Sequence, residues 1–306
     1  MKRIIAFAES NSIIGSGHLV RTIQLLSCLD EQLFKIDFYC NYDEAPQWLN
    51  EVDHKLIERE KFFELDMEDF DLLIFDSYEN RDILEKVTIK TLLIDDFCFL
   101  GNGNKAHIIL DFNYQTSERF YDKSKTLLGT SFFPIGKNTF PEFSGESAWN
   151  PKSKKILISA GGVSDKSLLD IDYLIELASL YGEIILMDPL SKLDKFTGKN
   201  IEIIKNESLS NVLSKEKFLF GIIAGGTSKY IAAAYSLPSL LIPRNDIEEL
   251  LIEKFLEDNL SINMDFLVER PQEKLLMKHF SIISDNLNKI ISEKNVFRLQ
   301  KEILAL

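Results

Sequence analysis

The sequence predicts an α/β protein with two doubly wound, Rossmann-like domains that face a cleft, and three observations lead to this fold class. Short apolar runs alternate with helical patterns, the runs are continuously apolar, and the alternation stops and restarts near the middle of the chain. Continuously apolar strands are typical of parallel sheets with helices on both faces. With 306 residues, the chain is also longer than one typical domain.

The first half of the chain supplies the strands of one sheet. We expect strands at 2–7, 34–40, 71–76, 90–95 and 107–111. Between the first two strands, Leu19, Ile23 and Leu26 recur at helical spacing, which predicts a helix over 18–32. This order of strand and helix is the pattern of a parallel, doubly wound sheet.

A polar segment at 141–153, rich in Pro, Gly and Ser, predicts the linker. We expect strands after it at 154–159, 183–187, 201–204, 218–224 and 238–242, with helices near 165–180, 227–236 and 246–258. The expected domains are therefore 1–145 and 152–306, with a last helix that can return to the first domain. Ligands of doubly wound folds bind at the carboxyl ends of the strands.

Composition excludes several classes of protein. The net charge of −13 and the pI of about 4.9 disfavour nucleic acid as a partner, although backbone amides can still bind a small anion. No apolar run is long enough to span a membrane, and residues 1–8 fit a first strand better than a signal peptide. We therefore expect a cytoplasmic protein; the sequence does not indicate its oligomeric state.

The three cysteines, Cys28, Cys40 and Cys98, show no C-x-x-C spacing. An odd and sparse set predicts buried thiols in a reducing compartment, not a disulfide framework or a zinc site. No other metal-ligand spacing is found, so we expect neither a metal nor a cofactor.

Two glycine turns follow expected strands of the second domain. Strand 154–159 leads into Gly161-Gly162, and strand 218–224 leads into Gly225-Gly226, followed by Thr227-Ser228. Glycine allows the backbone to approach a ligand closely, and the amides of a first helical turn can hold a phosphate. Tight turns also need glycine for conformational reasons alone, and the two hydroxyls could be helix caps. Neither the P-loop nor the dinucleotide-binding signature is present.

His18 is the strongest candidate for a reactive group. It follows Gly15-Ser16-Gly17 at the start of the first helix, where we expect it to face the cleft. A neutral imidazole at this position could act as a general base on a water or a hydroxyl. The alternative is a histidine that only packs at a helix start.

Acidic residues end two neighbouring strands of the first domain. Asp76 ends strand 71–76 and precedes Tyr78, and Asp95 and Asp96 end strand 90–95. Their carboxylates could orient the imidazole of His18 or bind sugar hydroxyls. The alternative is that they only form turns.

Several motifs together resemble a known family. They are Ile14-Gly15-Ser16-Gly17-His18-x-x-Arg21, Phe75-Asp76-Ser77-Tyr78, Ile94-Asp95-Asp96, Asp111-Phe112-Asn113, Ile158-Ser159-Ala160-Gly161-Gly162, Ala224-Gly225-Gly226-Thr227-Ser228 and Ala232-Ala233-Ala234-x-x-Leu237-Pro238-Ser239-Leu240. In this order, over about residues 3–255, they resemble the UDP-sugar hydrolases of pseudaminic acid biosynthesis. That family belongs with the spore-coat polysaccharide and MurG-like proteins of GT-B fold.

The resemblance implies a hydrolase that removes UDP from a 6-deoxy-2,4-diacetamido sugar by attack of water at the anomeric carbon. It implies that His18 is the base and that Asp76 and Tyr78 lie near the sugar. It also implies that the glycine turns hold the diphosphate, because their backbone amides can stabilise its negative charge. The expected substrate-binding residues are Gly15, Gly17, Arg21, Asp95, Asn113, Gly161, Gly162, Gly225, Gly226, Thr227, Ser228 and Asn245.

The sequence also departs from the family pattern. In strand one, Phe7 stands where the family has an arginine, and Glu9 stands where aspartate is usual. Tyr230 replaces the acidic residue that binds the ribose, and Asn245-Asp246 replaces an Asn-Gln pair. Gly136-Lys137 replaces an arginine near position 136. These changes remove charge on the nucleotide side. Three functions remain open: a nucleotide-sugar hydrolase, a GT-B glycosyltransferase that activates an acceptor hydroxyl, and a non-catalytic binder of a nucleotide-sugar.

Overall fold

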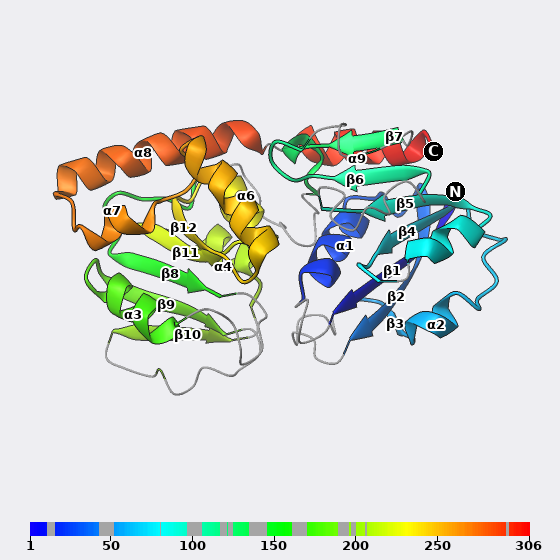
Figure 1. Cartoon of the computed structure of the whole chain (residues 1–306), viewed down its shortest axis with the longest axis horizontal. Helices are drawn as coiled ribbons and strands as arrows, with labels where there is room; N and C mark the ends of the chain where they lie inside the picture. The colour runs from blue at the N-terminus through cyan, green and yellow to red at the C-terminus, as the bar shows by residue number, and fades with distance from the viewer. Residues whose placement is uncertain are drawn as a thin grey trace. The chain divides into compact units, whose positions relative to one another are not determined.

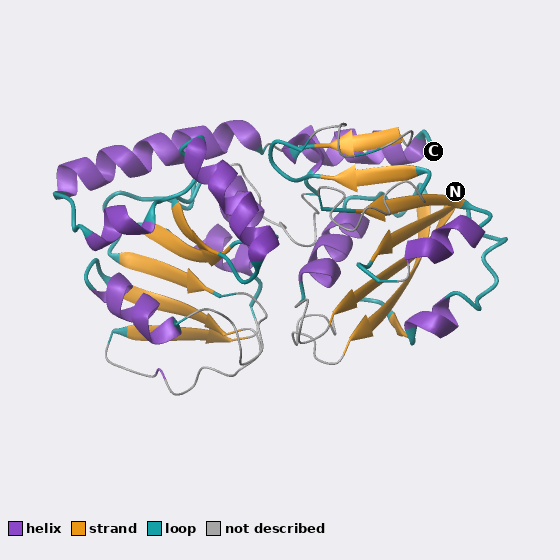
Figure 2. Cartoon of the chain, viewed as in Figure 1, coloured by secondary structure: helices purple, strands orange, loops and turns teal. Residues whose placement is uncertain are grey.

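The computed structural model describes residues 1–10, 16–42, 52–79, 81–96, 106–116, 121, 125–134, 146–160, 170–188, 196, 200–205, 207–291 and 294–306. Contacts within the chain divide it into two compact units. The first unit holds the described residues of 1–134 and 294–306, and the second holds those of 146–291. Each unit is built on its own parallel sheet (Figures 1 and 2).

The first unit has a seven-stranded sheet in the order β3-β2-β1-β4-β5-β6-β7, and every neighbouring pair is parallel. Its strands are β1 (Lys2–Ser10), β2 (Phe34–Tyr42), β3 (Lys55–Leu56), β4 (Leu72–Asp76), β5 (Lys90–Ile94), β6 (Ile108–Asp111) and β7 (Lys125–Leu128). The order reverses between β1 and β4, which makes their carboxyl ends the topological switch point of this sheet.

Helices cover both faces of the first sheet. They are α1 (Gly17–Ser27), α2 (Arg59–Phe62), the short 3₁₀ helices η2 (Arg81–Lys86) and η5 (Thr130–Phe132), and α9 (Lys294–Leu304). On one face, Phe7 of β1 and Phe75 of β4 stack at 5.6 Å and pack with Phe62 of α2 and Leu84 of η2. The opposite face of β1 and β4 packs against α1. Alternate residues of each strand therefore face α1 or the pair α2 and η2.

The second unit repeats this design with five parallel strands in the order β10-β9-β8-β11-β12. The strands are β8 (Lys155–Ser159), β9 (Glu183–Asp188), β10 (Ile201–Lys205), β11 (Phe220–Ala224) and β12 (Ser239–Ile242). The helices are α3 (Ile171–Ser179), α4 (Leu209–Lys215), α5 (Ser228–Ala234), α6 (Asp246–Glu257), α7 (Met264–Val268) and α8 (Glu273–Ile290). Here the switch point lies between β8 and β11.

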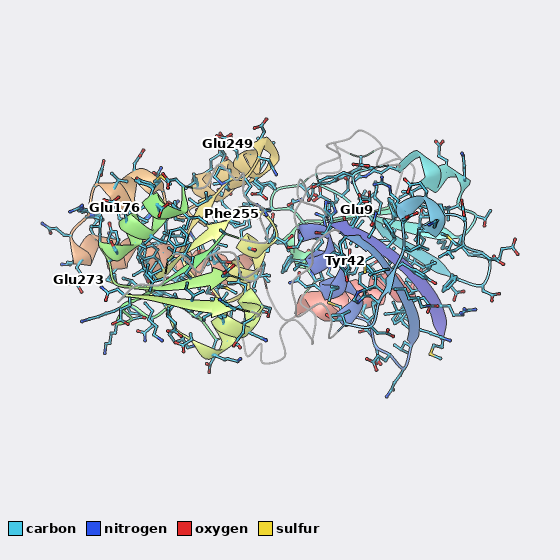
Figure 3. The ribbon with its side chains drawn as sticks, turned by 90° about the horizontal axis from the view of Figure 1, so that it is seen from below. Glu9, Tyr42, Glu176, Glu249, Phe255 and Glu273 are labelled. Carbon is cyan, nitrogen blue, oxygen red and sulfur yellow. The ribbon has the colours of Figure 1, made fainter. Side chains whose placement is uncertain are left out.

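Helix α6 shows how the helices of the second unit are built. Asn245 caps its first turn by accepting a hydrogen bond from the amide of Glu248 at 3.0 Å. Figure 3 shows Glu249 on the outer side of this helix, whereas Phe255 is only 1% exposed and packs edge-on against Tyr230. One apolar face thus ties α6 to its sheet.

The last helix, α9, belongs to the first unit. It contacts η5, Arg298 donates to the Ser131 hydroxyl at 3.0 Å, and Lys2 donates to the carbonyl of Leu304 at 2.7 Å. Leu299 and Ile303 are fully buried. The chain therefore begins and ends in the same unit (Figure 1).

The parallel α/β architecture predicted from the sequence is confirmed, and each of the expected strands is present. The sequence did not indicate the short strands β3 and β7 or the helices α2 and α4. The helix expected over 18–32 ends at Ser27, because the chain turns there toward β2. Among the described residues, no helix is both long and apolar enough to cross a membrane.

Candidate functional site

Several of the sequence-predicted residues lie at the switch points of the two sheets. In the first unit, Asp76 ends β4 and His18 lies in the first turn of α1, which follows β1. In the second unit, Gly225 and Gly226 follow β11 directly. The carboxyl ends of strands at a switch point are where doubly wound sheets bind ligands.

Three side chains of α1 converge on the carboxylate of Asp76. His18, Arg21 and Thr22 are spaced by three and four residues and so share one face of the helix. His18 Nδ1 lies 2.5 Å from Asp76 Oδ1, Arg21 donates to both Asp76 oxygens at 2.7 Å, and the Thr22 hydroxyl donates to Oδ2 at 3.1 Å. Asp76 is fully buried, and its carboxylate is enclosed by these three donors.

This geometry fixes the roles of the two imidazole nitrogens of His18. Burial acts to raise the pKa of Asp76, but Arg21 and His18 bring it down to about 2, so the carboxylate is ionised at neutral pH. Arg21 Nη2 also lies 3.2 Å from Nδ1, but the contact of Nδ1 with Asp76 is shorter. An ionised carboxylate only accepts hydrogen bonds, so Nδ1 carries a proton and, in the neutral ring, Nε2 is left as the acceptor. In the described part of the chain, Nε2 makes no hydrogen bond. A histidine in this tautomer can take a proton from a water or a hydroxyl.

Asp96 extends the network on its far side. Its Oδ2 accepts from Arg21 at 2.7 Å and from the Tyr78 hydroxyl at 2.5 Å, and its Oδ1 accepts from the Asn113 amide at 2.8 Å. Burial acts to raise the pKa of Asp96, but Arg21 and these donors hold it well below its usual range. The ring of Tyr78 meets that of His18 edge-on at 4.4 Å. The network thus holds both His18 and Tyr78 in place.

Asp95 lies outside this network, although it precedes Asp96 directly. It pairs with Arg81 of η2 at 2.6 Å, and both side chains are almost fully buried. Neighbouring residues at the end of β5 point to opposite faces of the sheet, so Asp96 meets α1 whereas Asp95 meets η2. Within the ion pair, Arg81 Nη2 and Asp95 Oδ2 are buried and have no hydrogen-bond partner among the residues that the structure describes.

The ring of His18 is more enclosed than the sequence suggested. It is only 4% exposed, whereas we expected it to face an open cleft. It is enclosed by Asp76, Arg21 and the ring of Tyr78, and it is not part of the apolar cluster on the opposite face of the sheet. A ligand that meets this histidine therefore has to reach Nε2.

The glycine turn of the second unit is crowded on its inner side. A Cβ on Gly225 would lie 2.6 Å from Ile252 Cδ1, and a Cβ on Gly226 would lie 2.6 Å from Arg244 Nη2 and 2.9 Å from Glu248 Oε1. A side chain on either glycine would require these neighbouring side chains to shift. Below the turn, buried Lys229 donates to the carbonyls of Gly225 and Gly226 at 2.6 Å and 3.3 Å. Glycine thus lets Ile252, Arg244 and Glu248 pack directly against this turn.

The other predicted residues have mixed outcomes. Thr227 precedes α5 and makes no capping hydrogen bond with its side chain, and Ser228 begins that helix. Asn245 is used as the cap of α6. Gly17 is the first residue of α1. The predicted residues Gly15, Gly161 and Gly162, together with Gly136 and Lys137, lie outside the described residues.

Two of the departures from the family pattern lie in protein interiors. Phe7 is fully buried in the apolar cluster of the first unit, and Tyr230 is 1% exposed and packs against Phe255. Glu9 forms an ion pair with Arg59 at 2.8 Å and accepts a hydrogen bond from Ser77. Neither aromatic residue takes over the charged role that the resemblance assigns to its position.

Sequence reasoning missed Arg81, Arg244 and Glu248. Arg244 and Glu248 were detectable as an Arg–Glu pair four residues apart directly after a strand. Arg81 had no such signal, because its partner Asp95 is distant in sequence. Among the residues that the structure describes, no three His, Cys, Asp or Glu side chains are grouped to hold a metal ion.

No family model and no curated protein matches the sequence. Solved structures do match along its whole length. A putative UDP-N-acetylglucosamine 2-epimerase from Listeria monocytogenes is 10% identical, with 99% of this chain and 95% of that chain covered and a TM-score of 0.66. UGT89C1 of Arabidopsis thaliana, complexed with UDP, is 9% identical, with 100% and 99% covered and a TM-score of 0.67. Spinosyn rhamnosyltransferase SpnG, complexed with thymidine diphosphate, is 12% identical, with 100% and 96% covered and a TM-score of 0.55.

These likenesses show the fold. Two units with all-parallel sheets, similar over the whole chain to UGT89C1, a rhamnosyltransferase and a putative epimerase, define the chain as an α/β protein of the GT-B type. At these identities they do not transfer an activity.

Proposed function

We propose that this protein is a hydrolase that cleaves a nucleotide-activated deoxyamino sugar, UDP-linked in our leading hypothesis, into free sugar and nucleotide during synthesis of a bacterial surface glycan related to pseudaminic acid. The observation that carries the proposal is the pair of His18 and Asp76 at the switch point of the first sheet. The GT-B fold and the ordered motifs of the sequence support the same class of substrate.

In the proposed reaction, Nε2 of His18 removes a proton from a water that attacks the anomeric carbon. The bond from that carbon to the diphosphate oxygen breaks, and the nucleotide leaves as an anion. Asp76 stabilises the imidazolium as it forms, because its carboxylate already accepts the Nδ1 proton. Arg21 keeps Asp76 ionised.

The leaving diphosphate needs donors that are fixed in place before the reaction. The turn Gly225-Gly226-Thr227 is our candidate, because it lies at the switch point of the second sheet and has no side chain at its two glycines. Thr227 and Ser228 add hydroxyl groups beside it.

The second candidate function is a glycosyltransferase in which His18 activates an acceptor hydroxyl instead of water. The similarity to a rhamnosyltransferase favours this alternative as much as it favours the hydrolase. The third is a non-catalytic binder, which the near-complete enclosure of His18 favours.

One experiment separates the three functions. The protein is incubated with UDP- and CMP-linked deoxyamino sugars in ¹⁸O-labelled water, without an acceptor. For a hydrolase we expect nucleotide release, with ¹⁸O in the anomeric hydroxyl of the sugar and none in the nucleotide. Release only after an acceptor is added would indicate the transferase, and binding without any turnover would indicate the binder.

A further inference from the structure

Arg244 lies directly beside the proposed diphosphate turn. It follows β12, the strand next to β11, and its Nη2 occupies the place where a side chain of Gly226 would be. A guanidinium beside a turn with no side chain is well suited to bind a phosphate, because its planar donors match phosphate oxygens.

Glu248 holds this guanidinium by one edge. Arg244 Nε donates to the two Glu248 oxygens at 3.0 Å and 3.1 Å, Nη2 contacts Oε1, and the backbone amide of Arg244 donates to Oε2 at 3.0 Å. The Glu248 side chain is 7% exposed and that of Arg244 is 16% exposed. Asn245 fixes the amide of Glu248 as the cap of α6. The arginine is thus preorganised by a buried partner.

The other edge of the guanidinium, which carries Nη1, is not bound by Glu248. Nε and Nη2 face Glu248, and in the described part of the chain Nη1 makes no hydrogen bond. Since Arg244 keeps some exposure, these N–H groups can meet a ligand that sits on the glycine turn.

We infer that Arg244 is a diphosphate-binding residue of this protein and that Glu248 is its positioning residue. The inference rests on the proposed function, since it needs a nucleoside diphosphate at the Gly225-Gly226 turn.

The test is calorimetric titration with UDP, TDP and uridine, which needs no turnover. In the double variant R244Q/E248Q the ion pair becomes a neutral pair, so the net charge is kept and no buried charge is left alone. We expect the affinity for UDP to fall about tenfold and the affinity for uridine to stay unchanged, because only UDP carries phosphates. Unchanged UDP affinity in this variant would overturn the inference.

Two further variants serve as a control and as a second test of the inference. Arg270→Gln removes one guanidinium near Tyr181, at the amino-terminal edge of the sheet, and should leave UDP binding unchanged. Arg244→Lys keeps the charge but loses the planar fork, so a smaller loss is expected; if the double variant does not fold, full affinity in R244K overturns the inference. If the wild type binds neither UDP nor TDP, the proposed function itself is contradicted.

Discussion

Asp76 accepts hydrogen bonds from three side chains of α1, and the one from His18 matters most for chemistry. The carboxylate selects the imidazole tautomer, Arg21 keeps it ionised, and Thr22 fills a remaining lone pair. At the residue scale, the account therefore makes Asp76 an orienting group and His18 the reacting group.

Asp76→Asn tests this division of roles. An amide can donate to Nδ1 and so favours the tautomer in which Nε2 carries the proton and cannot act as a base. We expect kcat to fall roughly 10²- to 10⁴-fold with little change in KM. Thr22→Val, which removes another hydrogen bond to the same carboxylate, should cost less than about tenfold. Equal effects of the two substitutions would contradict the role of Asp76.

The pKa of Asp76 also predicts how stability depends on pH. Because its folded pKa of about 2 lies below the ordinary value of 3.8, the carboxylate contributes stability above about pH 4 and loses it as the pH falls toward 2. The contribution is about 2 kcal/mol. Urea unfolding between pH 2 and pH 5 should show a shallower loss for Asp76→Asn than for the wild type. Asp69→Asn, at an exposed pair with Arg3, should follow the wild type.

The sequence indicated His18 and Asp76 through their positions at strand and helix ends, and Arg21 and Tyr78 through the resemblance to a family. It could not show which of Asp95 and Asp96 joins the network, because the face that each residue meets depends on where β5 ends and on which elements pack against it. Asp95 was predicted to bind substrate, and Asp96 is the residue that contacts Arg21.

At the scale of elements, the turn between β11 and α5 combines packing with proposed binding. Gly226→Ala would place a Cβ against Arg244 Nη2, at the flexible end of a long side chain that can shift at small cost. We therefore expect less than about 1 kcal/mol of lost stability but a severalfold weaker affinity for UDP. Thermal unfolding and calorimetry check the two effects, and an unchanged affinity would contradict the proposed role of the turn.

Element type was predictable wherever a strand was long and continuously apolar, as in β1, β4 and β11. The strand β3 has two residues, Lys55 and Leu56, and both are exposed, so no burial pattern marks it. The strand β7 begins with Lys125 and is an edge strand of four residues. These two strands form by pairing with a neighbouring strand, and the pattern of residues along the sequence does not show which strands are neighbours.

At the scale of the whole molecule, the last helix returns to the first unit. Leu299 of α9 is fully buried, whereas Leu304 on the same helix is 37% exposed. We expect Leu299→Ala to cost about 2–4 kcal/mol of unfolding free energy and Leu304→Ala less than about 1 kcal/mol. Denaturant unfolding of the two variants checks the difference, and equal losses would contradict this packing of α9.

The sequence predicted the parallel sheets but not the order of their strands, which depends on pairing between distant segments. That order places Asp76 and the Gly225-Gly226 turn at switch points, and this placement carries the functional argument.

The most direct test of that argument is a comparison of wild type and His18→Ala with a UDP-linked deoxyamino sugar, in which both nucleotide release and binding are measured. The account predicts that kcat falls at least about 10²-fold, whereas the Kd of the nucleotide-sugar changes less than about threefold, because the proposed diphosphate contacts lie in the second unit. Turnover that persists in His18→Ala would contradict the account.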